Sequence, residues 1–106
     1  MPKYLWKASY SPAGARGVAQ DGGSSRVEAV KKAAESVGGT LDAFYFAFGG
    51  ADAYVIADLP DNETAAAIAL TVNASDRASV ETVMLISPEE MDAATKKNVD
   101  FRPAGG

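Results

Sequence analysis

The feature that most constrains the fold is a pair of hydrophobic segments within residues 40–59. The segments cover residues 41–48 and 53–59, and the turn sequence Gly49-Gly50-Ala51-Asp52 separates them. Aromatic and β-branched residues favour strands, and a short glycine-containing turn is typical of the connection between two hairpin strands. Residues 40–59 therefore predict an antiparallel β-hairpin.

The hairpin lies between two helical patterns, and a further strand is expected at each end. Residues 3–10 alternate and carry aromatic side chains, and residues 80–86 are mostly aliphatic, so both segments are predicted as strands. Apolar residues recur at helical spacing before and after the hairpin, at Val27, Val30, Ala34 and Val37, then at Ala65, Ile68, Ala69 and Val72. The order βαββαβ predicts an α+β, ferredoxin-like sheet with helices on one face, in a single domain of residues 1–106.

Local signals predict where the first two helices begin and end. Ser11-Pro12 is typical of a helix start, but the glycines that follow predict a weak helix. A capping box from Ser25 to Glu28 predicts the start of a stronger helix, and Gly38 predicts its end.

Similar signals mark the last two helices. Asp61 or Asn62 is expected to cap the helix after the hairpin. The sequence Ser87-Pro88-Glu89-Glu90 is a second capping box, and it predicts a short helix that ends at about Asn98. Residues 98–106 contain proline and glycine and are expected to form an irregular tail.

Both faces of the predicted sheet are apolar. Strand alternation assigns the hairpin's first strand two sets of side chains, Phe44, Phe46 and Phe48 on one face and Leu41, Ala43, Tyr45 and Ala47 on the other. A sheet with one face in water would carry polar residues there, and an exposed apolar patch usually marks an interface. We therefore predict that the protein is its own partner, as a homodimer or higher oligomer with packed sheets. The alternative is that Val99 and Phe101 of the tail fold over the sheet.

Composition excludes several classes of function. The net charge of −4 argues against a nucleic-acid partner, whose phosphates require a basic surface. The chain has no Cys and no His, so it lacks thiolate nucleophiles and the usual zinc ligands, and no metal or cofactor is predicted. No apolar run is long enough for a membrane span or resembles a signal peptide, so a cytoplasmic protein without membrane contact is expected.

The chain resembles the GYD-domain proteins, small bacterial proteins of the dimeric α+β barrel class. The resemblance covers nearly the whole chain and is carried by Lys3-Tyr4-Leu5, Ala8-Ser9-Tyr10, Gly22-Gly23, Gly38-Gly39, Phe44-Tyr45-Phe46-Ala47-Phe48-Gly49, Asp58-Leu59-Pro60-Asp61 and Phe101-Arg102-Pro103. Alanine replaces tyrosine in the family's Gly-Tyr-Asp triplet, which is Gly50-Ala51-Asp52 here, so no role of that phenol carries over. The resemblance implies the ferredoxin-like fold and a dimeric barrel, and it brings no established biochemical activity.

Asp52 is the first candidate for catalysis. A carboxylate beside glycines can act as a base, with hydroxyls of Tyr10, Tyr45 or Tyr54 completing the proton transfers in a chain without His. The alternative interpretation is structural, because aspartate commonly satisfies backbone amides in turns.

Ligand binding has a separate set of candidates. Tyr4 and Trp6 can line an apolar pocket, although strand aromatics are also ordinary core residues. Arg16 and Arg26 lie near a predicted helix start and can form an anion site, although a simple helix cap would give the same sequence.

These observations leave two main hypotheses. The first is a homo-oligomeric protein that binds a small apolar or aromatic molecule or serves as an assembly subunit. The alternative is a cofactor-independent dimeric-barrel enzyme, an oxygenase or isomerase that acts on a small aromatic or lactone substrate. The enzyme hypothesis depends on fold analogy alone.

Overall fold

The computed structural model describes residues 1–106 and has the predicted α+β class. Its elements, in chain order, are β1 (Lys3–Tyr10), α1 (Pro12–Asp21), α2 (Gly23–Ser36), β2 (Thr40–Phe46), β3 (Ala53–Asp58), α3 (Asn62–Ala74), β4 (Ala78–Leu85) and α4 (Pro88–Ala94).

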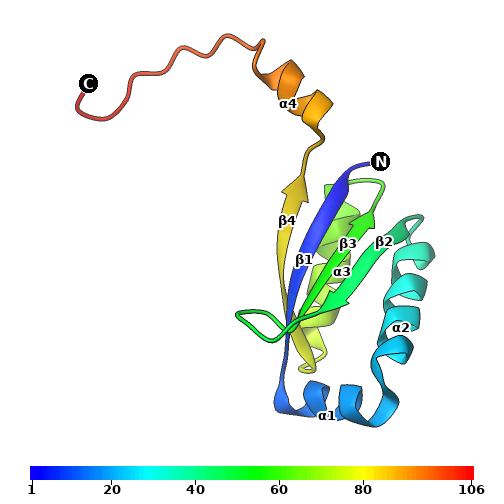
Figure 1. Cartoon of the computed structure of the whole chain (residues 1–106). Helices are drawn as coiled ribbons and strands as arrows, with labels where there is room; N and C mark the ends of the chain where they lie inside the picture. Colours follow the sequence, from blue (N-terminus) through cyan, green and yellow to red (C-terminus); the bar gives the residue numbers. More distant parts are fainter.

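The four strands form one open antiparallel sheet in the order β2-β3-β1-β4. β1 and β2 are therefore parallel and joined by a helical crossover, and α3 joins β3 to β4 in the same way. In Figure 1, α3 lies behind the sheet and α2 runs alongside β2. This arrangement is consistent with the ferredoxin-like fold expected from the sequence.

A β-bulge changes which side chains of β2 share a face. The pairing of β2 with β3 shifts between Leu41 and Ala43, so Asp42 is an extra residue. Leu41 lies opposite Ala57, whereas Ala43 lies opposite Ile56 on the other face. The prediction that Leu41 shares a face with Ala43 was wrong, because one inserted residue reverses the alternation.

The hairpin connection is wider than the four-residue turn expected from the sequence. β2 ends at Phe46, and the N–H of Ala47 donates to the carbonyl of Asp52 (2.8 Å). Phe48 lies outside the strand and is fully exposed. Its predicted place beside Phe44 and Phe46 was therefore also wrong.

The first helix is a regular one of ten residues, and the second begins earlier than predicted. The hydroxyl of Ser11 caps α1 by accepting from the N–H of Gly14 (3.1 Å), as expected for Ser11-Pro12. α2 begins at Gly23, and no side chain caps it, so the predicted capping box at Ser25 was wrong. Gly22 has φ of +85°, a conformation that glycine adopts without strain, and it lets α2 follow α1 directly.

Close packing fixes α1 against the start of β4. The carbonyl of Arg77 accepts from the backbone N–H of Ser11 (2.9 Å) and from its hydroxyl (3.1 Å). A Cβ atom at Gly14 would lie 1.8 Å from the same carbonyl oxygen. Only glycine permits this approach, and it positions α1 beside the pocket described below.

The later helix caps match the sequence. Asp61 caps α3 through the N–H of Thr64 (2.8 Å), and Ser87 and Glu90 form the predicted capping box of α4. α4 ends at Ala94, short of the predicted Asn98. The tail is irregular as expected, and every residue from 88 to 106 is exposed. Figure 1 shows α4 and the tail extending away from the sheet beyond β4, so the tail does not cover it.

The core lies on the side of the sheet that faces the helices. Its buried residues are Tyr4, Trp6, Val55, Ala57, Leu59 and Ala65, and half-buried side chains from α2, β2 and α3 pack around them. At the centre of this covered face the side chains of Ala8, Ala53 and Ala57 are small. Small side chains allow helices to approach a sheet closely.

The opposite side of the sheet, here called the open face, is covered by no element of the chain. It presents Lys3, Leu5, Lys7, Ser9, Ala43, Tyr45, Tyr54, Ile56, Asp58, Ser79, Glu81, Val83 and Leu85. Its central row is aliphatic, and charged residues lie in the rows on both sides of it, with Tyr45 and Tyr54 in the same row as Lys7 and Glu81.

The charged rows of the open face differ from each other. At one end the ammonium of Lys3 lies 2.8 Å from Asp42 and 3.0 Å from Asp58, and hydrogen bonds to Asp42 and then Asp58 raise the pKa of Lys3. On the other side of the aliphatic row Lys7 lies opposite Glu81 in the ladder, but the two side chains form no ion pair.

Candidate functional site

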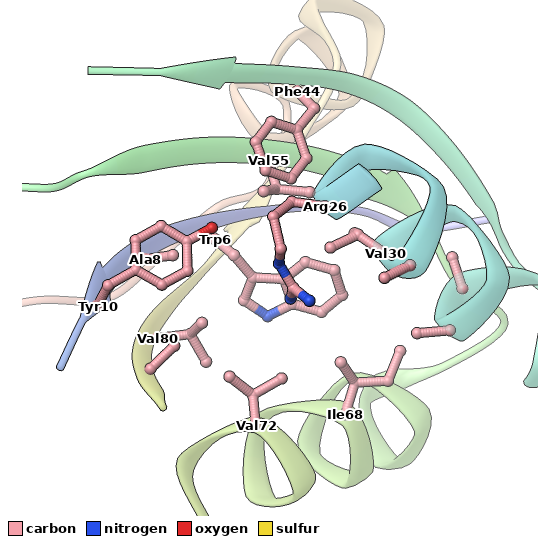
Figure 2. Close-up of a pocket in the computed structure, with 14 residues that line it drawn as sticks. Trp6, Ala8, Tyr10, Arg26, Val30, Phe44, Val55, Ile68, Val72 and Val80 are labelled. Carbon is pink, nitrogen blue, oxygen red and sulfur yellow. The ribbon is translucent and has the colours of Figure 1, made fainter. Parts of the chain in front are cut away.

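An apolar cavity lies between the covered face and helices α2 and α3. It has a volume of about 140 Å³, and 13 of its 14 lining residues are hydrophobic. We call it the inner pocket. Figure 2 shows the indole of Trp6 near the middle, with Phe44 and Val55 of the sheet on one side and Val72 and Ile68 of α3 on the opposite side.

Small side chains on the same elements create this space. Ala29, Ala33 and Ala34 of α2 line the inner pocket, as do Ala8 and Ala78 of the sheet. Alanine stabilises a helix but fills little volume, so these positions leave room beside the large indole of Trp6.

Trp6 contributes an unused hydrogen-bond donor to the inner pocket. Its side chain is buried, with 4% of the residue exposed, and its indole Nε1 has no hydrogen-bond partner in the protein. An unpaired buried donor costs about 1–3 kcal/mol, and most buried polar groups are paired. The N–H of Trp6 is therefore an unpaired donor buried in the wall of the inner pocket.

Arg26 is the one charged residue that lines the inner pocket. It lies in the first turns of α2 and is half-buried. Figure 2 shows its side chain extending toward the middle of the lining residues, and the hydroxyl of Tyr10 points the same way. Both ion pairs of the chain involve Lys3, so Arg26 has no carboxylate partner.

A second hollow, here called the outer cleft, adjoins the inner pocket beneath α1. Its volume is about 400 Å³, and it shares Tyr10, Arg26, Val72 and Ala78 with the inner pocket. Its other lining residues include Asp21, Arg77 and several small or polar groups of α1 and α3. The shared residues place Arg26 where the polar outer cleft meets the apolar inner pocket.

The structure brings three of the predicted site residues to one place. Trp6, Tyr10 and Arg26 all line the inner pocket. Arg16 is exposed on α1 and lines neither hollow, and Tyr4 is a core residue whose hydroxyl donates to Asn62.

The candidate catalytic residues are not gathered in one site. The carboxylate of Asp52 accepts a hydrogen bond from the backbone N–H of Tyr10 (2.8 Å), and the backbone N–H of Asp52 donates to Ala8 (2.8 Å). Asp52 thus ties the hairpin connection to β1, which is the structural role considered for it. Tyr45 and Tyr54 lie opposite each other on the open face, across the sheet from the Tyr10 ring that lines the inner pocket.

Two further observations limit the chemistry of the chain. No group of three or more acidic side chains is arranged to hold a metal ion. None of the helices has the length and apolar character needed to cross a membrane.

Sequence reasoning did not identify most of the pocket lining. Val30, Phe44, Ile68, Val72 and Val80 line the inner pocket, but their spacing is that of ordinary core positions. The sequence signal for the pocket was the excess of alanine on the side of α2 that faces the sheet, because an alanine-rich helix cannot fill the space next to a tryptophan.

Comparison with protein families gives one match. The family model described as the GYD domain matches residues 4–95. Comparisons with curated proteins and with solved structures give no match. The matched segment includes the sheet except Lys3, and all residues of the inner pocket and the outer cleft. Because it spans most of the 106 residues, the chain belongs to the GYD-domain family.

Proposed function

We propose that the protein is a homo-oligomeric binding protein for a small apolar or aromatic molecule. Its protomers are ferredoxin-like and pair through their open faces as a dimeric α+β barrel. The observation that carries the binding function is the inner pocket, which combines an almost wholly apolar lining with the unpaired donor of Trp6.

The size and lining of the inner pocket support a ligand of about one ring. An apolar cavity of about 150 Å³ in another protein stays dry and binds benzene. The inner pocket has nearly the same volume and a mostly apolar lining, but it is open to solvent along α2, where Ala29 and Ala33 are exposed. Small-molecule sites typically combine such a lining with a few polar groups that fix orientation, and Trp6, Tyr10 and Arg26 supply those groups.

The open face supports self-association. Leu5, Ile56 and Val83 form its aliphatic middle, Leu85 lies beside Lys3 at one end, and Tyr45 is 72% exposed. No helix or tail residue of the same chain covers them. Two open faces packed together would bury these side chains, and a two-fold axis makes such a surface complementary to itself.

The enzyme alternative has weaker support. A cofactor-independent oxygenase or isomerase would need Asp52 and tyrosine hydroxyls in one site, but Asp52 already accepts from a backbone amide, and Tyr45 and Tyr54 lie across the sheet from the inner pocket. We therefore place binding ahead of catalysis.

Native mass spectrometry of freshly purified protein, compared with the denatured mass, tests the proposal. The expected result is a dimer or higher oligomer that carries the added mass of a small organic molecule. A stable monomer at micromolar concentration would contradict the pairing. An oligomer without added mass, in a sample that also fails to bind aromatic probes, would contradict the binding function.

A further inference from the structure

We propose that the natural ligand is a small carboxylate with an aromatic or similarly compact apolar body. The body occupies the inner pocket, and the carboxylate pairs with Arg26 at the border with the outer cleft. This inference rests on the proposed binding function and specifies its ligand class.

The charge of Arg26 selects an anion. The side chain reaches a nearly apolar pocket and has no carboxylate partner within the chain. A charge beside apolar walls is less screened than one in water, so a ligand anion gains more there than at an exposed arginine. A neutral apolar ligand would leave this cation unmatched.

The other charges around the outer cleft favour a ligand with a single negative charge. Arg26 and Arg77 line the cleft together with Asp21, which carries the opposite charge. Two cations and one anion leave one positive charge for the ligand to neutralise. A planar carboxylate also matches the paired donors of a guanidinium group, which favours it over a doubly charged phosphate.

The indole of Trp6 supplies an independent reason for a ligand with oxygen atoms. Its Nε1 is buried and unpaired in a pocket that is otherwise apolar. A pure hydrocarbon would leave this donor unsatisfied, whereas a carboxylate, carbonyl or hydroxyl oxygen that reaches the buried nitrogen can accept from it. Figure 2 places the indole and the Arg26 side chain within the same ring of lining residues.

Phenylacetate and phenylacetamide are matched probes for this inference. They have the same ring and nearly the same shape, and they differ in charge. Binding is measured by isothermal titration calorimetry and by fluorescence of Trp6, which is the only tryptophan of the chain. Phenylacetate is expected to bind at least about tenfold more tightly than phenylacetamide, as a charge-assisted hydrogen bond would provide.

Variants assign the preference to Arg26. Arg26→Gln is expected to bind the two probes equally, whereas Arg16→Gln, on the exposed side of α1, is expected to keep the preference. Circular dichroism checks that both variants are folded. The comparison of the two probes on the unaltered protein needs no variant, so it decides the question even if Arg26→Gln unfolds.

The outcomes separate this inference from the proposed function. Equal binding of both probes to the unaltered protein, or a preference that survives in folded Arg26→Gln, would overturn the carboxylate assignment and keep the binding function. No response of the calorimeter and of Trp6 fluorescence to either probe at millimolar concentration would overturn both. A preference for phenylacetate that Arg26→Gln abolishes supports both.

Discussion

The two faces of the sheet have different uses, although both are rich in apolar residues. The covered face combines small alanine side chains with Tyr4 and Trp6, and the residues at its centre are buried. The open face has larger aliphatic side chains that stay half-buried at best, and charged residues lie in the rows on both sides of them. The covered face therefore stabilises the protomer and holds the inner pocket, and the open face is available to a second copy.

The difference shows that hydrophobicity alone does not distinguish a core from an interface. The sizes of the side chains and the positions of the charged residues distinguish the two faces. Small residues allow the helices to come close to the sheet, and they leave space for a pocket. Branched aliphatic residues flanked by charged residues form a surface that water can solvate before the surface pairs.

The largest expected effect is on the covered face. Leu59→Ala should lower the free energy of unfolding by about 2–5 kcal/mol, because it removes a fully buried side chain and leaves a cavity. The matched control is Leu70→Ala on α3, where the residue is 70% exposed and the loss should be less than about 1 kcal/mol. Urea unfolding followed by circular dichroism measures both. Equal losses at the two leucines would contradict this description of the core.

A charge introduced in the middle of the open face should weaken the association of two protomers. Ile56 lies between Leu5 and Ala43, so Ile56→Glu places a carboxylate in each half of the proposed interface. The dissociation constant should rise by at least about tenfold, since burying an unpaired charge is costly. Light scattering over a concentration series measures the change.

The control for this change is Ala66→Glu, at an exposed position of α3. It adds the same charge away from the open face and should leave the dissociation constant unchanged. If Ile56→Glu remains as tightly associated as the unaltered protein, the interface lies elsewhere.

The smallest expected effect is a loss of stability at acid pH. It arises at the start of α3, one of the helices that pack on the covered face. Hydrogen bonds from the hydroxyl and then the N–H of Thr64 lower the pKa of Asp61, which caps α3. Because the folded-state pKa lies below the unfolded one, the contribution of Asp61 is present above about pH 4 and is lost as the pH falls through the folded-state value.

Asp61→Asn tests this dependence, since asparagine can cap a helix without titrating. The difference in thermal midpoint between the unaltered protein and Asp61→Asn should be small near pH 6 and should change in favour of the variant below about pH 4. Thermal unfolding at a series of pH values measures it. A difference that stays constant with pH would show that Asp61 does not carry the effect.

Much of the fold could be predicted from local sequence signals. Ser11, Gly38, Asp61 and Ser87 mark helix ends through their own hydrogen bonds or backbone conformation, and β1 has the predicted bounds. These signals act within a few residues, so the sequence states them directly.

The errors arose where distant contacts decide the structure. The bulge at Asp42 depends on how β2 pairs with β3, and the start of α2 at Gly23 depends on the corner that follows α1. Neither is encoded by spacing within one segment.

The candidate site was predictable only in part, for the same reason. Trp6, Tyr10 and Arg26 could be named as separate residues, but their common position depends on α2 and α3 crossing the sheet with space between them. A cavity is a property of packing, and no pattern along the chain specifies its volume.

The exposed arm formed by α4 and the tail has a consequence for the hydrodynamic behaviour of the protein. The protomer measures 54 × 34 × 22 Å, and its radius of gyration is 16.7 Å. A compact domain of this length would have a radius of gyration of about 13 Å. A single protomer with its arm extended should therefore elute from a sizing column ahead of compact standards of equal mass, and the number of copies in the assembly follows from its mass rather than from its elution volume.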